Sequence, residues 1–386
     1  MISVSISPPN LEIATQWNEL VRRAAPNVFM NPAALCAAAQ TGFAKVHMLL
    51  AWDNDVSPQR LVGVWALGER RIAPFCPAVL DALPYDYAFL SSPVIDPDFT
   101  DVVVGAFFNA IAGDRSLPRV IHLALFDRAA PSFAAIQKLV SYRGGSQLVL
   151  AGEQRPCVSK EFGLKRSGAT RKKLRQDWNR LSAQGVVEVV NIRSPDEVRQ
   201  AFETFLALEQ ASWKGAHGTA LLCDARDAAF VRQLIANLSA SGDASVALLR
   251  VDGRAIAAQV LMYCGASAYT WKTAFDAAFA RYSPGALLVD KVTEQLLGTP
   301  GIEAIDSCSA ENGFMAHLWT GRQAIVDAVL DVGPGRSVAY LLEVARLSGY
   351  QRAKGLRDRW RARASARKVR AAPEYKTIIP NKGPSA

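Results

Sequence analysis

The chain has 386 residues, of which half are hydrophobic and a fifth are charged. This composition excludes a disordered chain, and the length favours two domains over one. The net charge of +9 is mostly local, because residues 352–370 carry +8 and leave about +1 for the rest. A body this close to neutral argues against a dedicated nucleic-acid-binding protein.

The six cysteines and four histidines are dispersed, and no Cys-x-x-Cys pair occurs. We therefore expect buried free thiols and predict neither a disulfide framework nor a bound metal. The N-terminal stretch has no basic segment followed by a continuous apolar run, so we expect no signal peptide and a cytoplasmic location. The uncharged run at 255–271 has a Cys-Gly-Ala turn at its middle, which fits two strands better than a membrane helix.

The first half of the chain alternates helical and extended patterns. Helices are predicted around 10–24, 29–42, 101–112 and 131–142, and strands at 45–52, 61–67, 85–93 and 119–126. A proline-punctuated stretch at 74–84 precedes the third of these strand-like runs.

The second half repeats this alternation. Helices are predicted at 164–185, 194–212, 225–241, 286–298 and 313–319 and from about 337, and strands at 186–192, 245–251, 255–263, 267–274, 302–308 and 322–332. Ser194, Pro195 and Glu197 predict a helix start with a capping box. The helix at 164–185 carries many arginines and lysines, which indicate either a solvated face or a site for an anion.

The two halves share one order of elements: a hairpin, a third strand, a helix and a further strand. The first hairpin strands begin about 200 residues apart, at Val46 and Val246. This pattern predicts a tandem duplication of one α/β unit. We predict an N-terminal domain at 1–155, a second domain at 156–335, and a C-terminal helix with a basic tail at 336–386.

The second copy contains a strand, a glycine turn and a helix between residues 267 and 298. Backbone N–H groups at such a helix start form an anion site, here at residues 283–287. The first copy has Ser-Ser-Pro-Val-Ile-Asp-Pro-Asp at 91–98 instead. Proline offers no N–H and aspartate repels phosphate, so we expect the anion site in the second half only.

Four stretches carry a resemblance to a known family. They are the basic helix at 167–181, Ser212-Trp213-Lys214-Gly215 with Gly218-Thr219, the run from Phe275-Asp276 to Tyr282-Ser283-Pro284-Gly285, and Asp306. Together they resemble the GNAT acyltransferases in their doubled, Fem-related form, and especially the CelD/BcsL-type, BioF2-like acetyltransferases linked to exopolysaccharide synthesis. The chain lacks the Gln/Arg-x-x-Gly-x-Gly/Ala loop of GNAT proteins.

The resemblance implies an α/β (α+β) fold of tandem GNAT-like domains, each a mixed, mostly antiparallel sheet flanked by helices, with a degenerate first copy. It implies transfer of an acyl group from acetyl-CoA or another acyl-CoA to an amine or hydroxyl of a sugar or cell-envelope precursor. The cofactor-binding residues would be Ser283, Pro284, Gly285, Ala286 and Leu287.

The resemblance also implies catalytic and acceptor-binding residues. The base candidates are Asp306 and Glu311, the acid candidates are Tyr282 and His317, and the acceptor pocket would be lined by Trp213 and Lys214. Each has a structural alternative, since Asp306 could be a buried hydrogen-bonded group, His317 a packed helix residue and Tyr282 a loop anchor.

Two other functions stay open. One is a Fem-like aminoacyltransferase that uses aminoacyl-tRNA, which would need a basic groove at the site. The other is a non-catalytic accessory protein of an exopolysaccharide synthesis complex. The 352–370 tail is a candidate contact to an anionic membrane or polymer at the inner face of the membrane.

Overall fold

The computed structural model describes residues 1–71, 73–161, 164 and 167–370. Side chains of residues 354, 356 and 358–370, and residues 165–166 of the predicted basic helix, lie outside this description. The chain forms two compact units, residues 1–339 and 340–386. Among the described residues, no helix combines the length and apolar composition that a membrane span requires.

The N-terminal half of the first unit is built around a long hairpin. Its strands are β1 (Ile2–Ser7), β2 (Val46–Asp53), β3 (Arg60–Arg70), β4 (Val79–Asp81), β5 (Val94–Ile95) and β6 (Val120–Asp127). Its helices are α1 (Ala14–Leu20), α2 (Pro32–Gln40), α3 (Thr100–Gly113) and α4 (Pro131–Tyr142), with the short 3-10 helices η1 (Val28–Met30) and η2 (Pro97–Phe99). β2 and β3 form the hairpin, and β4 and β5 pair with separate parts of β3.

The C-terminal half repeats this plan. Its strands are β7 (Ser146–Val149), β8 (Glu153–Ser159), β9 (Val187–Ile192), β10 (Ala244–Val251), β11 (Arg254–Cys264), β12 (Ser267–Phe275), β13 (Ala304–Asp306) and β14 (Gly321–Asp331). Its helices are α5 (Gly168–Ser182), α6 (Pro195–Gln210), α7 (Trp213–Ala216), α8 (Ala225–Ala240), α9 (Pro284–Gly298) and α10 (Met315–Leu318), with η3 (Leu221–Cys223) and η4 (Ala277–Tyr282). Helix α11 (Val338–Arg370) follows.

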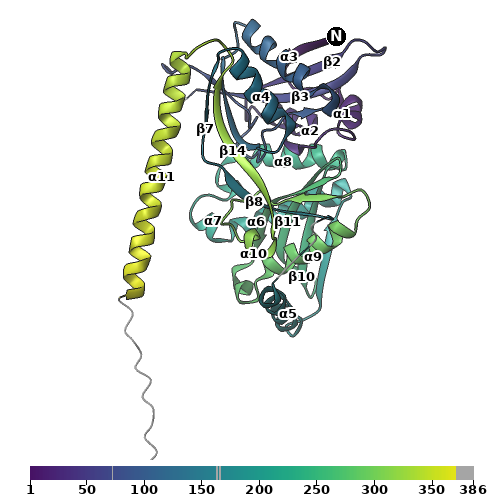
Figure 1. The fold of residues 1–386 in the computed structure, drawn as a ribbon. Helices are drawn as coiled ribbons and strands as arrows, with labels where there is room; N and C mark the ends of the chain where they lie inside the picture. The colour runs from purple at the N-terminus through teal and green to yellow at the C-terminus, as the bar shows by residue number, and fades with distance from the viewer. Residues whose placement is uncertain (72, 162–163, 165–166, 371–386) are drawn as a thin grey trace, which may run out of the picture. The chain divides into compact units, whose positions relative to one another are not determined.

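In the described chain these strands join one 14-stranded sheet in the order β1-β2-β3-β4-β6-β14-β8-β13-β12-β11-β10-β9, with β5 on β3 and β7 on β14. β14 connects the halves, because it pairs with β6 on one side and with β8 on the other. Figure 1 shows β14 running from one half into the other. Among the strands of the described residues, only β4–β6 and β12–β13 pair in parallel, so the sheet is mostly antiparallel, as predicted.

Helices cover both faces of the C-terminal sheet. On β10, Val246 and Leu248 belong to one core cluster and Ala247 and Leu249 to the other, as the two-residue period of a strand requires. The first cluster includes α6, α8 and much of the N-terminal half, and the second includes α9 and α5. The face under α6 and α8 is called the α6 face below, and the opposite face the α9 face.

The hairpins of the two halves share a detail that sequence patterns do not reveal. The pairing of β2 with β3 skips Val62, and the pairing of β10 with β11 skips Ile256. Each is a β-bulge on the second strand of its hairpin. A shared irregularity at matching places supports the predicted duplication of one unit.

Most predicted elements are confirmed to within a few residues, and the predicted helix at 131–142 coincides with α4.

The strand predicted at 85–93 is wrong, because the partners of β3 are β4 and β5, on either side of that stretch. The strand predicted at 302–308 is shorter, since Cys308 has φ +48° and turns the chain. Ser194 precedes α6 as predicted but makes no side-chain cap bond, so the capping box is wrong. Strands β1, β4, β5, β7 and β8 were not predicted.

Candidate functional site

β12 has an unpaired edge over more than half of its length. It pairs with β13 only from Ser267↔Ala304 to Tyr269↔Asp306, after which β13 ends and β12 continues to Phe275. The Thr270 hydroxyl donates to the Asp306 carbonyl at 3.2 Å and closes the point where the strands separate. Beyond this fork, the backbone groups on that edge of β12 are free to pair with an extended ligand.

The start of α9 lies at the far end of this edge. A Cβ added at Gly285 would lie 3.4 Å from the Phe275 ring, which shows how closely the first turn of α9 packs on the end of β12. Ser283, in the left-handed conformation with φ +53°, precedes the helix and makes no side-chain cap bond.

Two of the predicted anion-binding amides are already used. The Ser283 amide donates to the Ala280 carbonyl at 3.0 Å, and the Leu287 amide donates to the Ser283 carbonyl at 3.1 Å. The Gly285 and Ala286 amides have no acceptor within the described part of the chain. The first turn of this 15-residue helix therefore offers two N–H groups and the positive end of the helix dipole to an anion.

A small cavity of about 280 Å³ lies between α5 and α9. Its lining consists of Arg171, Leu174, Arg175, Trp178, Leu287, Asp290 and Lys291. Arg171 and Arg175 are exposed on α5, so part of the predicted basic helix lies next to the first turns of α9. This arrangement adds positive charge beside the free amides.

A lysine that the sequence analysis missed lies on the open part of β12. The pairing of β12 with β11 passes from Thr270 to Lys272 and leaves Trp271 as the extra residue of a β-bulge. A bulge turns neighbouring side chains toward one face of the sheet. The Lys272 ammonium lies 5.3 Å from the Trp271 ring and 4.8 Å from the Tyr87 ring, on the α6 face.

Three charged side chains from three helices face Lys272. They are Glu209 at the end of α6, Lys214 in α7 and Asp227 in α8. Burial lowers the pKa of Lys272 to about 8, although Glu209 raises it, while Lys214 and Asp227 act in opposite directions. A fraction of this amine is therefore neutral near physiological pH.

Both carboxylates near Lys272 have partners of their own. Glu209 is buried and accepts from Lys214 Nζ at 2.8 Å and from the Leu221 amide at 3.0 Å. Asp227 accepts from the hydroxyl of Tyr87, which belongs to the N-terminal half. Both halves thus build what we call the Lys272 cluster: Tyr87, Glu209, Lys214, Asp227, Trp271 and Lys272.

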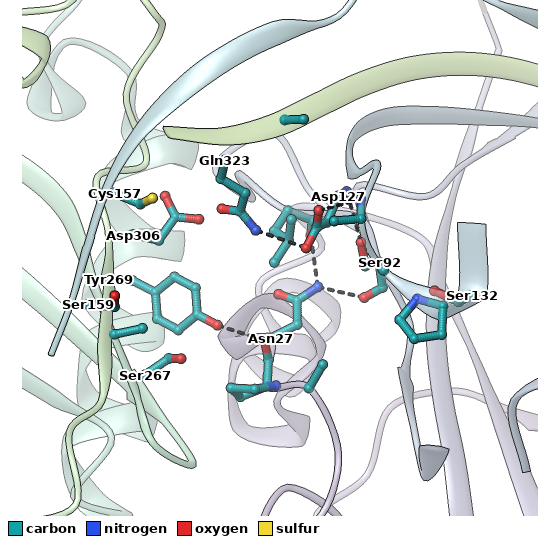
Figure 2. A pocket seen from close by; sticks show the side chains of 18 of the residues that line it. Asn27, Ser92, Asp127, Ser132, Cys157, Ser159, Ser267, Tyr269, Asp306 and Gln323 are labelled. Carbon is teal, nitrogen blue, oxygen red and sulfur yellow. Dashed lines mark hydrogen bonds between the residues drawn. The ribbon is translucent and has the colours of Figure 1, made fainter. Parts of the chain in front are cut away.

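A larger cavity of about 750 Å³ lies where the N-terminal half meets β12, β13, β8 and β14. Figure 2 shows Tyr269, Cys157, Asp306 and Gln323 on one side and Asn27, Ser92 and Asp127 on the other. Its surface is mostly apolar, and its polar groups are partly tied to each other. Gln323 donates to Asp127 at 3.0 Å, and the Tyr269 hydroxyl donates to the Pro26 carbonyl at 2.8 Å.

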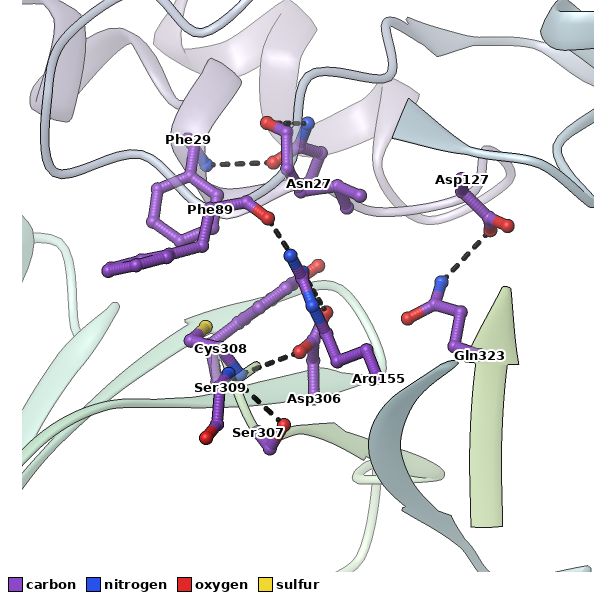
Figure 3. Close-up of polar contacts among 12 residues, drawn as sticks. Asn27, Phe29, Phe89, Asp127, Arg155, Asp306, Ser307, Cys308, Ser309 and Gln323 are labelled. Carbon is purple, nitrogen blue, oxygen red and sulfur yellow. Dashed lines mark hydrogen bonds and ion pairs between the residues drawn. The ribbon is translucent and has the colours of Figure 1, made fainter. Parts of the chain in front are cut away.

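Asp306, a predicted base, lies on the wall of this larger cavity and is held by a buried ion pair. Arg155 Nη1 donates to its carboxylate at 3.2 Å and to the Phe89 carbonyl at 2.6 Å (Figure 3). The Cys308 amide donates to the other carboxylate oxygen at 2.7 Å. Burial lowers the pKa of Arg155, but the neighbouring Asp306 carboxylate outweighs burial and raises it, so the guanidinium stays charged.

The structure does not bring the other predicted residues into one site. Glu311 and His317 are exposed in and near α10, and the Gln154 amide donates to Glu311 at 3.4 Å. Tyr282 is buried, with the guanidinium groups of Arg180 and Arg281 over its ring at 5.6 and 4.8 Å. Their catalytic roles stay predictions.

The two predicted acceptor-binding residues both lie in α7, beside the Lys272 cluster. Lys214 belongs to the cluster through its ion pair with Glu209. The Trp213 side chain is 63% exposed and packs edge-on against His217. Lys272 is the single charged residue of β12, and Glu209 lies one turn before Ser-Trp-Lys; these sequence signals could have identified both residues.

Comparisons with known proteins agree with this geometry. Residues 168–314 match the family model described as an acetyltransferase (GNAT) domain. No curated protein sequence matches the chain significantly.

Several solved structures share the fold over nearly the whole chain. FemX has a TM-score of 0.56 and 11% identity, covering 83% of this chain and 94% of its own. A conserved protein of unknown function from Bacteroides thetaiotaomicron has a TM-score of 0.54 and 11% identity, covering 85% and 100%. L-PGS from Bacillus licheniformis has a TM-score of 0.51 and 12% identity, covering 88% and 96%.

Identities this low show the fold alone, whereas the family match covers the sequence from α5 to the segment before α10. That span contains the open edge of β12, the start of α9 and all of the Lys272 cluster except Tyr87. The match of residues 168–314 to an acetyltransferase (GNAT) domain, together with the shared fold, supports an acyltransferase.

Proposed function

We propose that this protein transfers an acyl group from an acyl-CoA to an amine or hydroxyl of a sugar or cell-envelope glycan precursor. The observation that carries the proposal is the unpaired edge of β12 that ends at the two free amides of α9. An extended chain with amide groups, such as pantetheine, would pair with that edge, and a diphosphate would bind the helix start. Arg171 and Arg175 would attract a further phosphate.

This placement puts the thioester near the fork between β12 and β13. Transfer requires a base for the nucleophile, a donor to the thioester oxygen and an acid for the leaving thiolate. The acceptor would approach along the α6 face, past the exposed Trp213 and the Lys214 side chain. An exposed indole offers an apolar face to a sugar ring, and this supports a glycan acceptor.

The resemblance to CelD/BcsL-type proteins supports a role in exopolysaccharide synthesis. A Fem-like reaction with aminoacyl-tRNA changes the donor and not the fold. It predicts that charged tRNA binds, with an affinity that falls steeply with salt, and that acyl-CoA does not bind.

Isothermal titration with acetyl-CoA and longer acyl-CoAs tests the proposal. Ala286 is the third residue of α9, and Ala286→Glu places a carboxylate beside the free amides. We expect this variant to bind acyl-CoA at least roughly tenfold more weakly than the matched Ala286→Gln variant. A carboxylate is favourable at a helix N-terminus, so the melting temperature of Ala286→Glu should not fall.

Two results would count against acyl-CoA as the donor. One is the absence of binding heat with wild-type protein for every acyl-CoA tried. The other is equal affinity of Ala286→Glu and Ala286→Gln, which would place the diphosphate elsewhere.

A further inference from the structure

The Lys272 cluster lies beside the fork, where the proposed function puts the reacting thioester. Tyr269, the last β12 residue paired with β13, is three positions before Lys272. The bulge at Trp271 turns Lys272 toward the α6 face, whereas Thr273 contacts the start of α9 on the opposite face. A donor bound from the α9 face would therefore present its acyl group to a lysine on the acceptor side.

The surroundings of Lys272 keep its amine free of a fixed partner. Its ammonium forms no ion pair with any described residue, because Glu209 is paired with Lys214 and Asp227 accepts from Tyr87. The rings of Tyr87 and Trp271 exclude water on two sides. A buried lysine without a counter-ion is readily deprotonated, and such lysines serve as bases.

We propose that the neutral amine of Lys272 is the general base of the transfer, which rests on the proposed function of the same domain. The amine removes a proton from the acceptor N–H or O–H, and the acceptor lone pair forms a bond to the thioester carbonyl carbon. The C–S bond of the tetrahedral intermediate then breaks. The CoA thiolate takes the proton from the Lys272 ammonium, which leaves free thiol, acylated acceptor and neutral lysine.

Asp306 is the competing base, and its surroundings differ from those of Lys272. Both of its carboxylate oxygens are engaged, because one accepts from Arg155 and the other from the Cys308 amide, whereas the Lys272 amine has no ion-pair partner among the described residues. Neither bond needs to break for Lys272 to act. Glu209 and Lys214 act as positioning residues. Their ion pair engages the Glu209 carboxylate, which would otherwise pair with the Lys272 ammonium and keep it protonated.

Steady-state release of CoA thiol, with D-glucosamine as acceptor, measures the role of Lys272. We expect Lys272→Met to lower kcat about 10²- to 10⁴-fold and leave acyl-CoA affinity within threefold. Lys272→Arg keeps a positive charge but cannot lose a proton, so it should be equally impaired. Lys138→Met, at an exposed lysine of α4, is the matched control and should match wild type.

Chemical rescue separates a base from a merely structural lysine. Lys272→Cys treated with 2-bromoethylamine regains an amine at the same place and should regain activity, whereas treated Lys272→Met should not. The wild-type kcat/KM should rise with pH to a plateau, with a midpoint near 8.

Competitive acetylation of lysines with acetic anhydride, read by peptide mass spectrometry, gives a test that needs no turnover. Lys272 should titrate near pH 8 and be protected by bound acyl-CoA, whereas the acetylation of the exposed Lys138 should not change when acyl-CoA binds. Activity of Lys272→Arg above one third of wild type, or titration of Lys272 near 10.5, would overturn the inference. Binding and turnover in wild type would then still support the proposed function, which fails only if acyl-CoA neither binds nor reacts.

Discussion

The two halves of the first unit build the same elements but treat the third strand differently. In the C-terminal half the strand is continuous, as β12, and its free edge ends at α9. In the N-terminal half it is interrupted into β4 and β5, and residues 82–93 leave the sheet between them. That segment lines the C-terminal site, since Trp271 Nε1 donates to the Tyr87 carbonyl at 3.0 Å and Arg155 donates to the Phe89 carbonyl.

The two halves also differ at the helix that follows the third strand, which is α3 in the N-terminal half and α9 in the C-terminal half. At the start of η2 and α3, the buried Asp96 carboxylate accepts from the Asp98 amide at 3.3 Å and pairs with Arg23. The N-terminal copy thus holds an anion of its own where the C-terminal copy leaves two amides free. One copy of a duplicated unit can thus lose its own ligand site and instead contribute residues that line the site of the other copy.

Among the changes considered, loss of the ion pair between Arg155 and Asp306 should lower the free energy of unfolding the most. Arg155→Met leaves a buried carboxylate without its cation and releases residues 82–93, so we expect a loss of about 3–5 kcal/mol in unfolding free energy. Urea denaturation followed by circular dichroism measures it. The double variant Arg155→Met/Asp306→Leu should regain much of this loss, and equal stability of the single and double variants would contradict the assignment.

Lys272→Met should stabilise the fold while it removes activity. The pKa of Lys272 is lowered, so the unfolded chain binds this proton more tightly than the folded chain does, and the wild type is less stable below pH 8. Its stability recovers as the pH rises from about 8 to about 10.5. We expect a gain on the order of 1–3 kcal/mol for Lys272→Met at pH 7, shrinking above pH 8.

A structural lysine would give the opposite sign. Thermal melts of wild type and Lys272→Met between pH 7 and 10 decide between these outcomes. If the melting temperature of the variant minus that of wild type is negative or does not change with pH, burial of the Lys272 amine does not destabilise the fold.

The buried carboxylate of Asp81, in the N-terminal half, should give stability that decreases at low pH, whereas Lys272 gives stability that increases at high pH. Asp81 accepts from His122 Nδ1 at 2.9 Å and pairs with Arg70. Although burial raises the pKa of Asp81, the bonds from His122 and Arg70 outweigh burial and lower it. Its contribution is therefore present above the ordinary aspartate pKa and is lost as the pH falls through the lower, folded-state value.

We expect Asp81→Asn to cost about 1–2 kcal/mol at pH 7 and less below pH 4. Urea denaturation at pH 7 and at about pH 2 measures the difference, with Asp101→Asn, at an exposed residue of α3, as the control. An equal loss at both pH values would show that the charge of Asp81 is not what stabilises β4.

Local patterns predicted most helices and strands of both halves and the helix start at Ser283-Pro284-Gly285, because strand alternation, helix periodicity and helix starts depend on neighbouring residues. The Lys272 cluster was not predictable in this way. Its lysine faces the site because of a bulge that only the register of β11 defines, and Tyr87 lies far away in the sequence. Residues 85–93 have the aromatic composition of a strand, but their side chains pack against the other half instead.

The last prediction asks whether the start of α3 binds acyl-CoA as well. Val102 is the third residue of α3, as Ala286 is of α9, and its side chain is 56% exposed. Because Asp96 already places a carboxylate at the preceding turn, Val102→Glu should change acyl-CoA affinity less than twofold, compared with the tenfold loss expected for Ala286→Glu. Calorimetry with both variants and their glutamine counterparts measures this directly. Equal weakening by both substitutions would mean that each copy binds a donor, and the N-terminal half would then be a second active copy and not a wall of the first.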